Sequence, residues 1–200
     1  MKLVIVSGSH RLESQSERIS HALADRVFEF SLFDSVDILS LAGNPLPHWD
    51  ESIWSGDEEW KTRLAPWKQK LKEADALIVV TPEWNGMVPA GVKNFFLLFG
   101  TAELGHKPAL ITAISAGCGG AYPVVELRIS SYKNCRICYL PDHLIVRNVE
   151  RVFTGEDPEG DKHLQERVDY CLRLLKEYST GLKLVRKSDV IDYKTFRNGM

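Results

Sequence analysis

Three short apolar runs rich in Val and Ile constrain the fold of this chain more than any other feature. They span residues 3–6, 76–80 and 109–114, and none of them has a polar face. Runs of this kind are typical of parallel strands that are buried on both faces of a sheet. Val36-Asp37-Ile38 alternates instead, which indicates a strand with one wetter face at a sheet edge. Residues 135–140 are a fifth predicted strand.

Apolar residues at three- and four-residue spacing separate these strands and predict helices. The stripes run from Ile19 to Phe30, from Trp60 to Leu71 and from Leu164 to Leu175. A further helix is expected from Pro89 to Phe99, ending at Gly100. Its five consecutive apolar residues indicate burial against the sheet and a second surface, such as a partner subunit. This alternation predicts a three-layer α/β sandwich with right-handed crossovers. Five strands in a chain of 200 residues favour a flavodoxin-like parallel sheet in the order 2-1-3-4-5.

One domain should hold most of the chain, because 200 residues suffice for a single core. We expect residues 1–180 to form this domain and residues 181–200 to be a C-terminal extension. Residues 143–160 are interpreted as a peripheral addition.

Composition excludes several classes of protein. The chain has 25 Lys and Arg against 27 Asp and Glu, which argues against a dedicated nucleic-acid binder. The first apolar run is too short for a signal peptide, and none approaches the length of a membrane helix, so we expect a cytoplasmic protein with no membrane partner. Cys135 and Cys138 have C-x-x-C spacing, but they lie in a predicted strand and no second pair exists. We therefore expect four reduced cysteines and no metal site.

The candidate site follows from the fold, since such sheets bind ligands outside the carboxyl ends of their strands, where the strand order reverses. The loop after the first strand holds Ser9, Arg11, Ser14 and Ser16 and leads into a predicted helix. Unpaired N–H groups at a helix start, together with a guanidinium, favour a phosphate there. Alternatively, the serines only cap the helix.

Two more loops end at the same edge. Thr81 to Pro89 has two prolines, an Asn-Gly turn and the aromatic plane of Trp84, although this could be a plain turn with a core tryptophan. Ser115 to Ala121 has three glycines, which allow close approach to a ligand but also suit a plain turn. Together the three loops predict a site for a phosphorylated planar heterocycle.

The three motifs resemble those of the NADPH-dependent FMN reductase family, which includes flavin, quinone, azo-dye and chromate reductases. They are Gly8-Ser-His-Arg-Leu-Glu-Ser14, Pro82-Glu-Trp-Asn-Gly86 and Ser115-Ala-Gly-Cys-Gly-Gly120. They occur in the family's order, and the resemblance covers residues 1–180.

The resemblance implies an FMN-dependent oxidoreductase that moves a hydride from NADPH or NADH through flavin N5 to a small acceptor. It assigns the FMN phosphate to Ser9, Arg11, Ser14 and Ser16. It assigns the isoalloxazine to Pro82, Glu83, Trp84, Asn85 and Gly86, with Ser115, Gly117, Gly119 and Gly120 at its other edge. Backbone amides around residues 117–120 would stabilise negative charge on the flavin. No catalytic acid or base is assigned.

Other interpretations remain open. FMN could be a loosely held substrate, or the protein could be a flavin-binding, redox-sensing module without turnover. A phosphoacceptor domain is rejected, because the third strand ends in Val80-Thr81-Pro82 and not in an acidic residue. The resemblance also implies a homodimer or homotetramer. The segment 43–54, which has two tryptophans, is either a lid or oligomer contact, or a loop folded onto its own domain.

Overall fold

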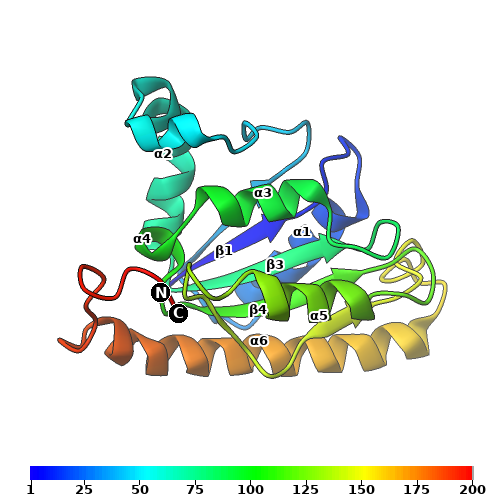
Figure 1. Cartoon of the computed structure of the whole chain (residues 1–200). Coiled ribbons are helices and arrows are strands. Elements are labelled where there is room, and N and C mark those ends of the chain that lie inside the picture. Colours follow the sequence, from blue (N-terminus) through cyan, green and yellow to red (C-terminus); the bar gives the residue numbers. More distant parts are fainter. Residues whose placement is uncertain (200) are drawn as a thin grey trace.

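A computed structural model describes residues 1–199 and shows the alternation of strands and helices that the sequence predicts (Figure 1). The strands are β1 (Lys2–Ser7), β2 (Ser35–Ser40), β3 (Ala76–Pro82), β4 (Pro108–Ile114), β5 (Cys138–Tyr139) and β6 (Leu144–Val146). The helices are α1 (Gln15–Glu29), the 3-10 helix η1 (Glu51–Ser55), α2 (Glu58–Glu73), α3 (Ala90–Leu98), α4 (Thr101–Leu104), α5 (Ala121–Ser130) and α6 (Pro158–Arg186). All strand pairs are parallel, and the order β2-β1-β3-β4-β5 confirms the predicted flavodoxin-like sheet.

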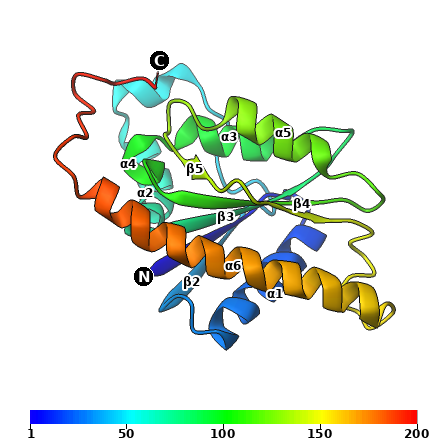
Figure 2. The ribbon, with the colours of Figure 1, turned by 90° about the horizontal axis from the view of Figure 1, so that it is seen from below.

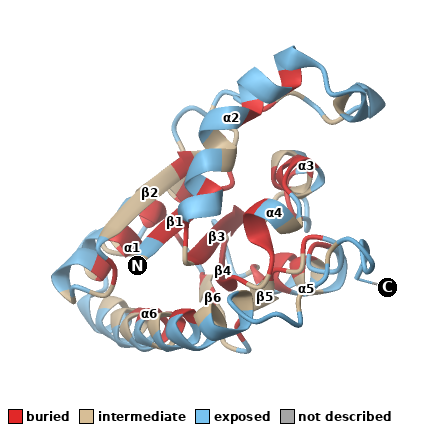
Figure 3. Ribbon diagram, turned by 90° about the vertical axis from the view of Figure 1, so that its left-hand side faces the viewer, coloured by how far each residue is buried: buried red, intermediate tan, exposed pale blue. Residues whose placement is uncertain are grey.

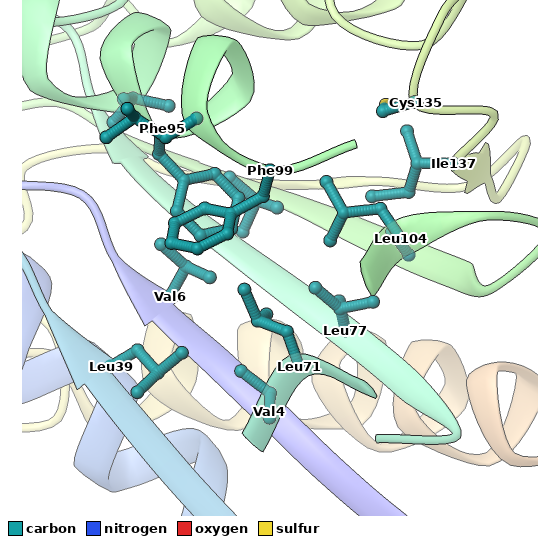
Figure 4. Packing of buried hydrophobic residues seen from close by; sticks show 14 of the residues in the cluster. Val4, Val6, Leu39, Leu71, Leu77, Phe95, Phe99, Leu104, Cys135 and Ile137 are labelled. Carbon is teal, nitrogen blue, oxygen red and sulfur yellow. The ribbon is translucent and has the colours of Figure 1, made fainter. Parts of the chain in front are cut away.

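Alternate residues of each strand pack into two separate cores. Val4 and Val6 of β1 join the core beneath α2, α3 and α5, whereas Leu3 and Ile5 join the core beneath α1 and α6. Figures 1 and 2 show these two groups of helices on opposite faces of the sheet. In the first core, Phe95 and the adjacent Phe99 ring lie over the sheet with their centroids 4.9 Å apart (Figure 4). The continuous apolar runs are therefore buried on both faces, as their composition predicts.

The last position of the sheet differs from the prediction. β5 is two residues long and pairs with the start of β4, while β6 pairs with the end of β4. Pro141 lies between them and cannot donate a ladder hydrogen bond, so one continuous strand is replaced by two short ones. Leu144 and Val146 are buried in the core beneath α6. The prediction that residues 143–160 are a peripheral addition is wrong for this strand.

The connection between β2 and α2 is anchored at one end and exposed at the other. The Asn94 side chain accepts a hydrogen bond from Trp49 N and donates one to Pro47 O, both of 2.8 Å. Trp54 in η1 is 76% exposed, and Figure 3 shows α2 and the segment before it projecting away from the sheet. The first half of segment 43–54 therefore folds onto its own domain. The prediction of a lid or oligomer contact stays open for Trp54.

The C-terminal region continues beyond the predicted domain boundary. α6 runs past residue 180 to Arg186, whose guanidinium contacts Asp75 Oδ1 at 3.3 Å and donates to His106 O at 3.1 Å. Tyr193 then stacks on the His106 ring, with the centroids 6.1 Å apart. The proposed boundary falls inside a helix, and the division into domain and extension stays a prediction.

Other features concern the cysteines, metals and membranes. All four cysteines are free, and Cys135 lies in the turn before β5 and not in a strand. Within residues 1–199, no three His, Cys, Asp or Glu side chains are grouped as metal ligands. In the same range, no helix combines the length and apolar character needed to span a bilayer.

Candidate flavin site

The three loops identified in the sequence meet at the carboxyl edge of the sheet. Ser7 of β1 pairs with Val80 of β3, and Pro82 of β3 pairs with Ile114 of β4. The strand order reverses between β1 and β3, where doubly wound sheets bind their ligands. A cavity of about 90 Å³ lies among the loops. It is lined by Ser9, Arg11, Ser14, Gln15, Ser16, Pro82, Glu83, Trp84, Ile114, Ser115, Ala116, Val149 and Glu150.

The first loop is pressed against β3 before it enters α1. Gly8 N donates to Val80 O at 2.8 Å, and a Cβ at Gly8 would lie 2.6 Å from that oxygen and 2.6 Å from Val92 Cγ2. Only glycine fits this approach without a backbone shift. Ser14 caps α1 by accepting a hydrogen bond from Glu17 N at 3.2 Å.

Ser16 is the decisive residue of this loop. Its side chain is 1% exposed, yet its Oγ has no hydrogen-bond partner among residues 1–199. Buried hydroxyls are normally paired, because an unpaired one costs about 1–3 kcal/mol. Ser16 is the second residue of α1, in the first helical turn, whose N–H groups lack partners within the helix. The residues present therefore fit an anionic group such as the phosphate of FMN.

The second loop is a tight turn from Trp84 to Met87. Trp84 N donates to Met87 O at 3.0 Å, and Met87 N donates to Trp84 O at 2.9 Å. The two central residues, Asn85 and Gly86, have φ values of 50° and 73°, as in the turns that favour Asn-Gly. The Trp84 ring meets the His10 ring edge-on, with the centroids 4.5 Å apart. The turn thus holds a half-buried aromatic ring at the mouth of the cavity.

The third loop is held by residues on both of its sides. Gly120 has a φ of 103°, and its N–H donates to the Glu83 carboxylate. Arg147 Nε donates to Cys118 O and Gly119 O at 2.8 and 3.1 Å. Part of the amide set expected to face the flavin is therefore already bound to a carboxylate.

The structure brings together most of the residues expected at the site. Ser9, Arg11, Ser14, Ser16, Pro82, Glu83, Trp84 and Ser115 share the cavity. Asn85, Gly86, Gly117, Gly119 and Gly120 do not line it, because they lie at the turn tip or along the glycine-rich loop. The assignment of these residues to FMN stays a prediction.

A wider groove of about 600 Å³ lies along α6 and not at the strand ends. Its border includes Asp169, which is already bound by Arg26 at 2.9 and 2.6 Å. This carboxylate is therefore already neutralised by an ion pair within the chain.

Comparison with known proteins places the chain among flavin-dependent reductases. The model of the family "NADPH-dependent FMN reductase" matches residues 1–150. The chain belongs to this family. Membership confirms the prediction of an FMN-dependent NAD(P)H oxidoreductase.

Individual relatives agree with this result. A 2-hydroxy-1,4-benzoquinone reductase from a Burkholderia species is 28% identical, over 92% of this chain and 97% of its own. An NADPH azoreductase from Bacillus sp. (strain OY1-2) is 27% identical, over 94% of this chain and 97% of its own. Among solved structures, the flavoenzyme NAD(P)H:(acceptor) oxidoreductase FerB from Paracoccus denitrificans superposes with a TM-score of 0.71 at 18% identity. That structure covers 90% of this chain and 97% of its own, and it supports the fold.

Sequence reasoning missed the wall that the connection from β6 to α6 contributes. Val149 and Glu150 line the cavity, and Arg18 donates to Val149 O and to Val152 O, which holds this turn against α1. The signal was the apolar run 144–146, which forms a strand and therefore ends at the same sheet edge as the other loops. Within this reductase-family fold, a fourth loop thus borders the site.

Proposed function

We propose that this member of the FMN reductase family binds FMN at the carboxyl edge of its sheet and reduces small quinone- or azo-type acceptors with NADPH or NADH. The observation that carries the proposal is the buried, unpartnered Ser16 Oγ at the start of α1. Relatives over nearly the full chain are named for a benzoquinone and for azo compounds, which supports this class of acceptor.

The first loop supplies the groups that would hold the phosphate. The hydroxyls of Ser9, Ser14 and Ser16 line one cavity, and the N–H groups of the first turn of α1 carry partial positive charge. Arg11 is exposed at the rim of the same cavity and can turn its guanidinium toward a phosphate. The arrangement favours a phosphorylated flavin over riboflavin.

The other loops would orient the ring. When bound, FMN supplies the capacity to accept a hydride from a nicotinamide and to pass two electrons on. The 84–87 turn offers an aromatic wall, and the glycine-rich loop offers backbone amides and close approach. We expect a nicotinamide and an acceptor to use one position beside the ring in turn.

Flavin titration of wild-type protein and the Arg11→Ala variant tests the proposal. Losing a charged phosphate contact should weaken the binding of FMN by about 1.5–3 kcal/mol and leave the affinity for riboflavin unchanged. Arg63→Ala, on the exposed side of α2, is the matched control and should alter neither affinity. Equal losses for FMN and riboflavin would contradict the assigned role of Arg11. NAD(P)H oxidation with quinones and azo dyes then separates a reductase from a flavin-binding module without turnover.

We further propose that the protein is a homo-oligomer. An exposed apolar stripe follows one side of α5 into the next turn and consists of Tyr122, Val125, Ile129 and Tyr132. Leu97 of α3, 61% exposed, adds to the apolar surface on the same side of the sheet. Exposed apolar surface of this kind is typical of an interface. Light scattering should show assembly that the Ile129→Glu variant loses, while Val190→Glu, in the exposed tail, should retain it. A cytoplasmic location, where NAD(P)H is available, is part of the same proposal.

A further inference from the structure

The carbonyl groups of the glycine-rich loop all point to one side. Gly117 O accepts from Asn148 N at 3.0 Å, and Arg147 Nε donates to Cys118 O and Gly119 O. In a trans peptide the C=O and the N–H point in opposite directions. The N–H groups that follow these carbonyls, those of residues 118, 119 and 120, therefore point away from Arg147.

Glu83 lies on that opposite side. Gly120 N donates to Glu83 Oε2 at 2.5 Å, and a Cβ at Gly119 would lie only 2.6 Å from Glu83 Oε1. Glu83 N also donates to Ile114 O at 2.9 Å, which fixes the start of the side chain to the end of β4. The peptide between Gly119 and Gly120 is thus held by a cation at its oxygen and by an anion at its nitrogen.

The same residue also borders the cavity. Glu83 is one of the residues that line it, together with Ser16 and Trp84. A negative charge beside a bound flavin disfavours the reduced form, because reduction adds negative charge to the ring. The effect is strong only when the carboxylate is held in place, and the bond to Gly120 N provides that restraint.

We propose that Glu83 and Arg147 are positioning residues that fix the amides of residues 118–120, and that the Glu83 carboxylate lowers the reduction potential of bound FMN. The first part concerns the protein alone, whereas the second rests on the proposed function. A lower potential makes the reduced enzyme a stronger electron donor toward its acceptor.

Hydrogen exchange of the flavin-free protein tests the positioning role. We expect Glu83→Ala and Arg147→Met to speed exchange of the amides in residues 115–120 about tenfold. Glu83→Gln should stay near wild type, because its amide oxygen still accepts the bond from Gly120 N. Arg151→Met, at an exposed arginine of the same connection that pairs with Glu156, should have no effect. Unchanged exchange in both Glu83→Ala and Arg147→Met would overturn the positioning role.

The reduction potential of the FMN complex tests the electrostatic role. Glu83→Gln keeps the hydrogen bond but removes the charge. It should therefore increase the affinity for reduced FMN about tenfold relative to the affinity for oxidised FMN. For a two-electron couple this corresponds to a rise of about 30 mV. An unchanged potential in a variant that binds FMN would overturn this role. Failure of wild-type protein to bind FMN would refute the proposed function and the potential shift together, and the exchange experiment would still decide the positioning role.

Discussion

Buried polar groups at the two edges of the sheet differ in whether they have hydrogen-bond partners. At the carboxyl edge, Ser16 Oγ is buried without a partner among residues 1–199, in a residue that lines a cavity. At the amino edge, Lys107 Nζ donates to Leu71 O and to Lys72 O at the end of α2. There Asp75 also accepts from Lys2 N at 3.0 Å and contacts Arg186 at 3.3 Å. One edge leaves hydrogen-bonding capacity unused, and the other uses it within the chain.

This difference is what we expect between a binding site and structural polar packing. Burial alone does not identify a site, because Lys107 is only 6% exposed and yet donates two hydrogen bonds within the chain. An unpaired group lowers the stability of the empty protein and is satisfied only when a ligand supplies the missing partner. Substitutions at the amino edge should therefore change stability, and those at the carboxyl edge should change affinity.

The largest expected effect is the pH dependence that Lys107 gives to stability. Burial, and then the nearby Arg186 charge, lower the pKa of Lys107 from its ordinary 10.5 to about 8. The unfolded chain holds this proton up to about pH 10.5, whereas the folded protein releases it near pH 8. Between these values the unfolded state binds more protons, so the contribution of Lys107 to stability rises with pH by about 3 kcal/mol.

Urea unfolding of wild-type protein and Lys107→Met between pH 7 and 10.5 measures this contribution. The stability of wild type relative to the variant should grow across this pH range. Because both proteins contain the same cysteines and tyrosines, the titration of those groups cancels in the difference. Lys162→Met, at an exposed position on α6, should give a difference that does not change with pH. A constant difference for Lys107→Met would show that this lysine titrates normally.

Asp75→Ala should give the next largest effect. Removing the carboxylate leaves Arg186, whose side chain is 17% exposed, without its anion and leaves Lys2 N without its acceptor. We expect a loss of about 2 kcal/mol in the free energy of unfolding, measured in urea, with the FMN affinity unchanged. Asp189→Ala, at an exposed position, should change stability by no more than about 0.5 kcal/mol. A weakening of FMN by Asp75→Ala would contradict the separation of the two edges.

The sequence predicted the sheet because its strongest signals are local. Leu3 to Val6 and Ala76 to Val80 are apolar at every position, and a strand with both faces buried requires that composition. The helix start after the first loop is predictable for a similar reason, since Ser14 caps α1 and Ser16 lies in its first turn. Patterns formed by neighbouring residues therefore predict the local structure well.

The features that the sequence did not reveal depend on distant contacts. The amide of Gly120 was expected to be free for a flavin, but the carboxylate of Glu83, 37 residues earlier, occupies it. The strand Leu144–Val146 has only three residues, too few to show periodicity, and its role comes from pairing with β4. Neither partner can be inferred from spacing along the chain.

The smallest effect is also the most direct test of the carboxyl edge. Ser16→Ala should weaken the affinity for FMN about tenfold, or about 1.4 kcal/mol, because it removes one hydrogen bond to a charged group. The stability of the empty protein should stay within about 0.5 kcal/mol of wild type or rise, because the lost hydroxyl has no partner there. Ser20→Ala provides the contrast, since Ser20 is buried on the same helix and donates to Ser16 O at 2.7 Å. It should cost about 1 kcal/mol in stability and leave the FMN affinity unchanged. If calorimetry and urea unfolding gave both variants the same pattern, the unpaired hydroxyl of Ser16 would be a packing defect and not part of a ligand site.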